Sequence, residues 1–340
     1  MGNNEGIIIK NVTKIFSQRV LFSKKKFKAV ENVSLHITKN PPEIFSLVGE
    51  SGSGKSTLAN ILLQLIEPDS GEILLNGKKI NHFETAEFMK KIQPIFQDPF
   101  DSFDPMKKTE LFIYETIKNF NISKKREAIN SIIDQYLKKV GLNYQMIKDK
   151  YPHEFSGGQL QRIAIARALV VQPWFLVADE PVSMLDASLR TSIVNLFKQL
   201  KEEENLSVLY ITHDLSTAYY ISDRIGVMLR GNLVEIGNAK EILDEPLHPY
   251  TQFLKKSVLE PDPDKKKIPL SETEKEEVKM TVISEYQLEG CKYANRCPVA
   301  KKICKEKTPE YYSVKGRKVK CFLYEKSEKK NNDEMPLFYR

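Results

Sequence analysis

The chain has no long apolar run, no recognisable leader and little cysteine. No apolar stretch of its 340 residues approaches the roughly 18 residues of a membrane-spanning helix, so we expect no transmembrane segment. Residues 1–5 lack the basic and apolar regions of a signal peptide, and Gly6 stands where myristoylation requires Ser or Thr. The hydrophobic content of 41% and charged content of 29% indicate a soluble protein with a substantial core. We therefore expect an intracellular protein.

The four cysteines are confined to one short, basic stretch. Five, six and sixteen residues separate Cys291, Cys297, Cys304 and Cys321. From Cys291 to Cys321 there are ten Lys or Arg and two Glu, a net charge of +8, whereas the whole chain carries +7. A nucleic-acid contact would explain such a patch, and so would simple solvation.

The chemistry of these cysteines is limited by their spacing and by the reducing environment. Disulfides are unusual in a reducing cytosol. Structural zinc sites favour closer pairs of the form C-x₂₋₄-C, which this stretch does not supply. Four thiolates fit an iron–sulfur cluster better, and the surrounding cations would offset its negative charge. A zinc site and four buried thiols without a ligand remain alternatives.

Residues 49–57 fit the phosphate-loop pattern G-x-x-x-x-G-K-[ST]. An apolar strand pattern precedes them, and a helical pattern follows until Pro68. Glycines let backbone N–H groups turn inward around a phosphate, and the helix N-terminus adds partial positive charge. Lys55 should reach the β- and γ-phosphates, and the Ser56 hydroxyl should bind Mg²⁺. We expect nucleotide contacts from Gly49, Ser51, Gly52, Gly54, Lys55, Ser56 and Thr57.

Polar side chains follow three other apolar strand patterns. Asp179 and Glu180 end the run at 174–178, His213 follows 207–212, and Gln97 follows 92–96. An aspartate at such a strand end can hold Mg²⁺, and the next residue can orient or deprotonate the attacking water. We expect His213 to contact the γ-phosphate, and Gln97 to contact Mg²⁺ and water. Alone, each has an ordinary structural explanation.

A second glycine-containing turn, Ser156-Gly157-Gly158-Gln159, precedes another helical pattern. Ser156 can act as an ordinary helix N-cap. The same arrangement is also an anion-binding nest, about a hundred residues from the phosphate loop. One chain is unsuited to folding both nests onto one phosphate, so we expect a dimer in which each subunit lends this turn to the other's nucleotide.

Strand patterns alternate with helical patterns over the first 260 residues, which predicts a largely parallel α/β core. We expect strands at 7–16, 29–37, 44–48, 72–75, 78–80, 92–96, 174–178, 207–212, 224–229 and 233–236. We expect helices after residue 57 and at 126–140, 159–170, 188–204 and 215–221. We divide the chain into a nucleotide-binding domain (1–260), a linker (261–287), a cysteine module (288–324) and a loose tail (325–340).

The order of these motifs resembles the nucleotide-binding subunit of an ATP-binding-cassette (ABC) transporter over residues 7–260. The motifs are the phosphate loop, Gln97, Ser156-Gly157-Gly158-Gln159, Asp179-Glu180, Ser183-Met184-Leu185-Asp186 and His213. The resemblance implies a P-loop NTPase cassette with a RecA-like parallel core, an antiparallel β subdomain and a helical subdomain at 98–170. It also implies that Phe16 stacks on adenine, that Asp186 couples two ATP sites across a dimer, and that the segment after Gln97 faces membrane subunits. A core aromatic and a surface loop are the plain alternatives for Phe16 and Asp186.

A basic loop (Lys24, Lys25, Lys26 and Lys28) precedes Ala29-Val30, and this loop and the Phe155 opening of the signature resemble the second of the two paired ATPase subunits in oligopeptide/dipeptide importers. Finer motifs are similar to the ATPases of these importers in general. They are Phe96-Gln97-Asp98-Pro99-Phe100, Tyr151-Pro152-His153-Glu154-Phe155-Ser156, Asp179-Glu180-Pro181-Val182-Ser183 and His248-Pro249-Tyr250-Thr251. The resemblance implies two transmembrane permease subunits and a paralogous ATPase subunit, or a second copy, as partners. It further implies indirect action with an extracellular substrate-binding protein, a place on the cytoplasmic face of the membrane, and a [4Fe–4S] cluster on the cysteines.

The expected function is ATP hydrolysis that drives uptake of oligopeptides or dipeptides, with oligosaccharides as an alternative cargo. A competing class is a soluble ABC ATPase that acts on nucleic acid through the basic cysteine module. The single cassette, without a coiled-coil insertion between Lys55 and Ser156, argues against that class, so we expect no nucleic-acid partner. A cassette fused to an iron–sulfur sensor is a third and weaker possibility.

Overall fold

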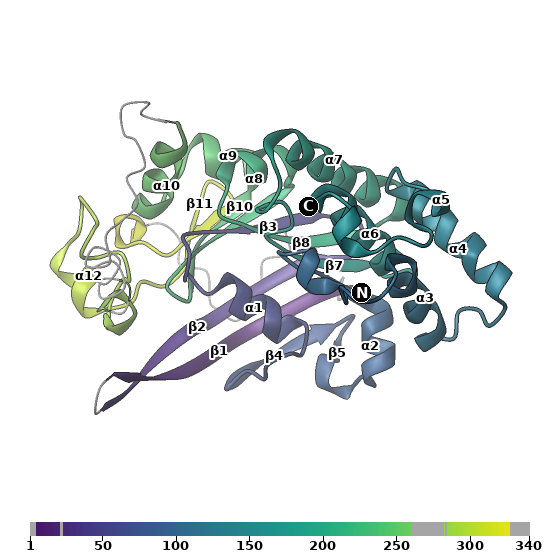
Figure 1. Ribbon diagram of the computed structural model, residues 1–340. Helices are drawn as coiled ribbons and strands as arrows, with labels where there is room; N and C mark the ends of the chain where they lie inside the picture. The colour runs from purple at the N-terminus through teal and green to yellow at the C-terminus, as the bar shows by residue number, and fades with distance from the viewer. Residues whose placement is uncertain (1–4, 21–22, 260–281, 283, 327–340) are drawn as a thin grey trace. The chain divides into compact units, whose positions relative to one another are not determined.

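The computed structural model describes residues 5–20, 23–259, 282 and 284–326 (Figure 1). It divides into two compact units, one of Met1–Ile37, Phe45–Gly77 and Thr212–Arg340 and another of Thr38–Ile44 and Lys78–Ile211. No helix within the described ranges is both long enough and apolar enough to cross a membrane. Most of the predicted linker (261–287) and of the predicted tail (325–340) lies outside the described residues.

The first unit contains an antiparallel sheet built on a long hairpin. Strands β1 (Gly6–Val20) and β2 (Ser23–Thr38) are neighbours, and β1 pairs with β4 (Ser70–Leu75) (Figure 1). The sequence predicts a basic loop between the first two strands, but the structure continues β2 through it. Lys26 and Lys28 are exposed while Ala29 is buried, the alternation that a strand with one buried face requires.

A second sheet of this unit places the phosphate loop. Strand β3 (Ile44–Val48) is parallel to β9 (Arg224–Leu229), and β10 (Asn232–Asn238) is antiparallel to β9. All five residues of β3 are buried, which explains its unbroken apolar character. The β9–β10 turn is Arg230-Gly231, with φ of 42° and 84°, and β10 begins at Asn232, one residue before the strand predicted at 233–236.

Before the C-terminal segment, the described part of this unit contains four α-helices. They are α1 (Lys55–Leu62), α8 (Leu215–Ile221), α9 (Ala239–Asp244) and α10 (Pro249–Leu259). Val48, Val227 and Tyr250 share one buried cluster with Tyr293, a residue more than forty positions further along the chain. The core of the sheet therefore includes part of the cysteine-containing stretch.

The C-terminal segment (residues 284–326) joins this second sheet instead of standing apart. It contains α12 (Lys302–Glu306), β11 (Tyr312–Val314), β12 (Arg317–Val319) and the short 3₁₀ turn η4 (Phe322–Tyr324). Strand β12 is antiparallel to β10, with Glu235 opposite Val319. A separate C-terminal cysteine module is therefore not confirmed.

The second unit has a parallel sheet of β6 (Ile92–Ile95), β7 (Phe175–Asp179) and β8 (Ser207–Thr212). Its helices are α2 (Thr85–Lys91), α3 (Thr109–Asn119), α4 (Arg126–Lys139), α5 (Tyr144–Ile147), α6 (Gly157–Leu169) and α7 (Ala187–Glu204). The unit also contains the two-residue strand β5 (Lys78–Lys79) and the 3₁₀ turns η1 (Ile80–His82), η2 (Phe100–Ser102) and η3 (Pro152–Glu154). The predicted strands and helices of this region are confirmed to within two residues at each end, whereas α2, α3 and α5 had no sequence prediction.

Candidate nucleotide-binding site

The phosphate loop lies between β3 and α1, as the sequence predicts. Gly49 and Gly54 adopt φ of 154° and 105°, a conformation that side-chain-bearing residues rarely adopt. A Cβ at Gly49 would lie 2.2 Å from the Met228 carbonyl oxygen, and one at Gly54 would lie 2.1 Å from that of Ala29. These glycines are therefore required by the close approach of neighbouring backbone as well as by their φ.

Lys55 is the first residue of α1, and its buried side chain contacts the backbone of the loop. Its ammonium donates to the carbonyl oxygens of Gly49 at 2.8 Å and Glu50 at 3.0 Å. The Leu58 N–H donates to the Gly54 oxygen at 3.0 Å, which begins the helix directly after the loop. A cation and a helix N-terminus thus meet at one turn of backbone, the combination that favours phosphate.

Two other predicted nucleotide contacts belong to the same unit. His213 follows β8 and is exposed, while the next residue, Asp214, caps α8 by accepting from the N–H of Ser216 at 2.9 Å. Phe16 on β1 is 36% exposed, and its ring lies 6.1 Å from that of Phe27. Their contacts with phosphate and adenine remain predictions.

The acidic pair of the second unit lies at the carboxyl end of β7. Asp179 is the last residue of the strand, and Glu180 follows it with φ of 46°. The Glu180 N–H donates to the Ile211 oxygen of the neighbouring strand at 2.9 Å, and its carbonyl accepts from the Ser183 hydroxyl at 3.0 Å. A left-handed conformation in a non-glycine residue costs about 1–2 kcal/mol, so these contacts hold Glu180 in an otherwise unfavourable position.

Gln97 and Asp186 are exposed in the second unit. Gln97 lies two residues beyond β6, on the segment that continues into η2. Asp186 caps α7 by accepting from the Leu189 N–H at 3.0 Å and from the Ser188 hydroxyl at 2.8 Å. The backbone hydrogen bond from Leu189, followed by the hydroxyl hydrogen bond from Ser188, lowers the pKa of Asp186. Asp186 therefore carries a negative charge at neutral pH.

The Ser156 turn forms a complete capping box at the start of α6. The Gln159 N–H donates to the Ser156 hydroxyl at 3.3 Å, and the Ser156 N–H donates to the Gln159 side-chain oxygen at 3.0 Å. A Cβ at Gly158 would lie 3.0 Å from Leu189, so this glycine lets α6 approach α7 closely. The N-cap alternative is confirmed, while the phosphate contact of this turn remains a prediction. The hydroxyl still has a hydrogen to donate.

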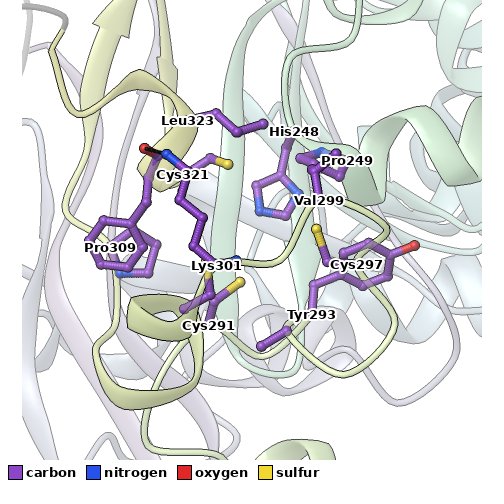
Figure 2. Close-up of a pocket in the computed structure, with 13 residues that line it drawn as sticks. His248, Pro249, Cys291, Tyr293, Cys297, Val299, Lys301, Pro309, Cys321 and Leu323 are labelled. Atoms are coloured by element: carbon purple, nitrogen blue, oxygen red, sulfur yellow. Dashed lines mark hydrogen bonds between the residues drawn. The ribbon is translucent and has the colours of Figure 1, made fainter.

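The four cysteines line one cavity in the first unit, together with His248, Tyr293 and Lys301. Figure 2 shows the sulfurs of Cys291, Cys297 and Cys321 facing the same space. Burial, with a smaller contribution from the neighbouring thiols, raises the pKa of Cys291 to about 12. Within the described ranges, no three His, Cys, Asp or Glu side chains are grouped closely enough to hold a metal ion. The predicted iron–sulfur site is therefore not confirmed.

Sequence reasoning missed a charged cluster behind the phosphate loop. The Glu50 carboxylate contacts Arg230 of the β9–β10 turn and Arg296 of the C-terminal segment. Glu285 contacts the same two arginines and is only 2% exposed. Glu50 occupies a variable position of the phosphate-loop pattern, and no motif marks Arg230, Glu285 or Arg296. The cluster joins three distant stretches of the chain, so only a structure reveals it.

The comparisons with known proteins agree with this arrangement. The ABC transporter family pattern matches residues 30–183, and the pattern described as the oligopeptide/dipeptide transporter C-terminal region matches residues 234–304. The oligopeptide transport ATP-binding protein AppF of Bacillus subtilis is 42% identical over 332 residues, which cover 95% of this chain and 98% of the relative. OppF of Streptococcus pyogenes is 47% identical over 244 residues, covering 71% of this chain and 78% of the relative.

Solved structures of ATP-binding cassettes resemble the chain as well. The cassette MJ0796, solved as a dimer bound to ADP and phosphate, has a TM-score of 0.59 and 31% identity. The match covers 68% of this chain and 98% of that one. CbiO1 of Clostridium perfringens, part of an ABC transporter complex, has a TM-score of 0.59 and 26% identity, covering 71% of this chain and 91% of that one.

The glycine-rich loop, the acidic pair Asp179-Glu180 at the end of β7 and these matches together define an ABC-type ATPase. At this identity and coverage, the chain belongs to the family of oligopeptide-transport ATP-binding proteins within the ABC transporters. The predicted family and the predicted ATPase class are confirmed.

Proposed function

We propose that the chain is the ATP-hydrolysing subunit of an importer for oligopeptides or dipeptides. The 42% identity to an oligopeptide transport ATP-binding protein over 95% of the chain carries this proposal. The match of residues 234–304 to the C-terminal region of oligopeptide/dipeptide transporters supports it, because that region lies outside the general cassette pattern. Oligosaccharide uptake remains the alternative cargo, since cargo is chosen by other chains.

Each residue of the site has a separate role in ATP hydrolysis. The phosphate loop and Lys55 bind the phosphates, Phe16 supports adenine, and Ser56, Gln97 and Asp179 hold Mg²⁺. Glu180 orients or deprotonates the attacking water, and His213 contacts the γ-phosphate. Mg²⁺, when bound, would polarise the phosphate oxygens and offset part of their negative charge. The backbone contacts that hold Glu180 at φ of 46° support its role, because such strain is typical of functional positions.

The subunit acts with other chains at the membrane. Two transmembrane permease subunits contact the segment after Gln97, and a paralogous ATPase subunit or a second copy supplies the Ser156 turn and Asp186 to each ATP. The protein is then peripheral, on the cytoplasmic face, with an extracellular binding protein delivering the cargo. The nucleotide-binding domain comprises residues 1–260, with the helical subdomain at 98–170.

The cysteines are the residues that would hold a [4Fe–4S] cluster. Their fit rests on the donor set alone: four cysteine side chains line one cavity, although the described side chains are not grouped closely enough to hold a metal ion as they stand. The cluster would supply a covalent link between the start and the end of the C-terminal segment. Protein purified without oxygen should contain iron and acid-labile sulfide, and Cys321→Ser should lose both. A stoichiometric zinc content, or no metal in either protein, would exclude the cluster.

The basic stretch gives little support to nucleic-acid binding. Among its cations, Lys292, Arg317 and Lys320 are buried, and Arg296 contacts Glu50 and Glu285. Burial or ion pairing keeps these four cations from contacting a nucleic-acid backbone. Solvation and internal pairing therefore account for the +8 better than a nucleic-acid face does.

Reconstitution tests the transport function directly. The chain is combined in liposomes with its permease subunits, the paralogous ATPase and the binding protein, and ATP hydrolysis is measured. The binding protein loaded with oligopeptide should stimulate hydrolysis severalfold over the unloaded protein. Stimulation by oligosaccharide but not by peptide would overturn the proposed cargo, and an absence of any hydrolysis would overturn the enzyme.

A further inference from the structure

The C-terminal segment contacts the phosphate loop at Glu50 and Gly52, and Arg230 of the β9–β10 turn contacts Ser51 between them. Arg296 donates to both carboxylate oxygens of Glu50, at 2.8 and 3.0 Å, in a bidentate pair. The Tyr286 hydroxyl donates to the Gly52 carbonyl oxygen at 2.6 Å. Between them, Arg230 donates to the Ser51 oxygen at 3.5 Å and is itself held by Glu285 of the segment.

These side chains form a closed ring of alternating charge. Glu285 lies 2.7 Å from Nε of Arg230 and 2.7 Å from Nε of Arg296, while Glu50 completes the ring through the same two arginines. Arg230 and Glu285 are 4% and 2% exposed, whereas Glu50 and Arg296 are 25% and 29% exposed, so the inner half of the ring is screened from water. Two carboxylates and two guanidinium groups balance, and removal of any member leaves a poorly solvated charge behind.

Aromatic rings contact Arg296 of the C-terminal segment and help to hold it beside Glu50. Its guanidinium lies 5.0 Å from the ring centre of Tyr293 and 5.9 Å from that of Tyr250. Tyr250 also accepts the Glu50 backbone N–H at 2.9 Å. Burial alone would raise the pKa of Glu50, but the hydrogen bond and charge of Arg296, with those of Arg230, lower it. Glu50 is therefore a carboxylate at neutral pH, within the loop that binds a polyanion.

The contacts to carbonyl oxygens have a directional consequence. A trans peptide unit points its C=O and its N–H in opposite directions. Contacts that hold the Ser51 and Gly52 oxygens from outside the loop therefore fix the orientation of the following N–H groups. Phosphate binding at a glycine-rich loop depends on such preset N–H groups.

We propose that Arg296, Glu285 and Tyr286 are positioning residues for the phosphate loop, so that the C-terminal segment supports the ATP site from outside the loop. They hold the loop backbone and neutralise Glu50 beside the triphosphate. The inference rests on ATP binding by this loop, as proposed above, and it assigns a role to a segment that no nucleotide motif covers.

The test compares Arg296→Gln with Arg296→Lys, Glu50→Gln, Tyr286→Phe and the double variant Glu50→Gln/Arg296→Gln in the full-length chain. Lys315→Gln is the matched control, because it breaks an exposed ion pair with Glu245 elsewhere in the same segment. Steady-state hydrolysis gives KM and kcat for Mg·ATP, and calorimetry gives Kd for Mg·ADP. Circular dichroism and thermal unfolding verify folding of each protein.

Arg296→Gln should raise the KM for ATP about tenfold, with a smaller rise in Kd for ADP, which carries less charge, and kcat within threefold. Arg296→Lys should recover part of the loss, because it keeps the charge without the planar fork. Arg296→Gln leaves two carboxylates with one guanidinium, whereas the double variant leaves Glu285 paired with Arg230, so the KM of the double variant should return to within threefold of Glu50→Gln. Tyr286→Phe should raise KM severalfold.

Two results would overturn the proposal. One is a KM for Arg296→Gln that stays within twofold of Lys315→Gln. The other is a folded double variant that binds no better than Arg296→Gln, since a merely structural arginine would not be rescued by removal of Glu50. Failure of the wild-type chain to bind ADP or hydrolyse ATP would instead contradict the proposed function, so the two failures are distinguishable.

Discussion

Glu180 combines a strained backbone with a position at the end of a buried strand. Its φ of 46° is maintained by hydrogen bonds to Ile211 and Ser183. The amide of glutamine can keep the same backbone and shape but cannot accept a proton from water. We expect Glu180→Gln to lower kcat by about 10²–10³-fold while ATP binding persists.

Hydrolysis and ATP binding are measured separately for this variant. Glu203→Gln is the matched control, because Glu203 is an exposed carboxylate of α7 whose only described hydrogen bond is with Gln199. The control should keep the wild-type rate. Unchanged turnover in Glu180→Gln would remove this carboxylate from the mechanism.

Lys320 is a buried lysine directly after β12. Burial lowers its pKa to about 8, against its usual value of 10.5. Between these two pH values the unfolded chain binds a proton that the native chain has released, so the free energy of unfolding rises with pH in that window. We expect Lys320→Met to be more stable than wild type at pH 7, and this advantage to shrink by about 2 kcal/mol or more as the pH rises to 10.5.

Urea unfolding of both proteins from pH 7 to 10.5 measures this difference. Lys305→Met, at an exposed lysine of the same segment, should show a stability difference that changes little with pH. A difference for Lys320→Met that is constant over the range would contradict burial of the charge.

At the scale of elements, β12 is attached to the sheet by more than its backbone pairing. Arg317 is 2% exposed and donates to the carbonyl oxygens of Glu241 at 2.8 Å and Glu245 at 2.6 Å, at the end of α9. It also lies 3.6 Å from the buried Glu235, which accepts the N–H groups of Leu247 and His248. One side chain therefore joins β12 to α9 and to Glu235 of β10.

Arg317→Met should destabilise the protein by about 3–5 kcal/mol, because it leaves the Glu235 carboxylate and the helix-end carbonyls without their cation. Urea or thermal unfolding measures the loss. Lys315→Gln, two residues away in an exposed pair, should cost about 1 kcal/mol or less. Equal stability of the two variants would mean that the C-terminal strand is not anchored through Arg317.

The elements that the sequence predicts well are those whose pattern is local. The strand at 44–48 and the helix at 188–204 match β3 and α7 closely, because a buried parallel strand and an amphipathic helix each carry their own periodicity. The phosphate loop is equally predictable, since its glycines are fixed by φ and by close backbone contacts within one stretch.

Other features depend on partners that are distant in the sequence. Strand β12 has three residues and no clear pattern, and it exists because β10 offers a free edge. The basic run before Ala29 reads as a loop, although its pairing in the β1–β2 hairpin makes it a strand. The ring around Glu285 joins residues up to 246 positions apart, so no local pattern contains it.

For the molecule as a whole, we predict that one chain cannot complete its own ATP site. The phosphate loop and the Ser156 turn are both suited to anions, and the proposed sandwich uses one from each partner. The MJ0796 cassette, which this chain resembles, was solved as a dimer. Mg·ATP should therefore drive association with the paralogous ATPase subunit or with a second copy when hydrolysis is blocked.

The most direct measurement is the mass of the Glu180→Gln chain by light scattering, alone and with the paralogous subunit, with and without Mg·ATP. The account predicts a species of two ATPase chains that forms only with Mg·ATP and is lost when Lys55→Ala prevents nucleotide binding. A chain that binds Mg·ATP yet remains monomeric in both mixtures would contradict the shared site and, with it, the proposed mechanism of transport.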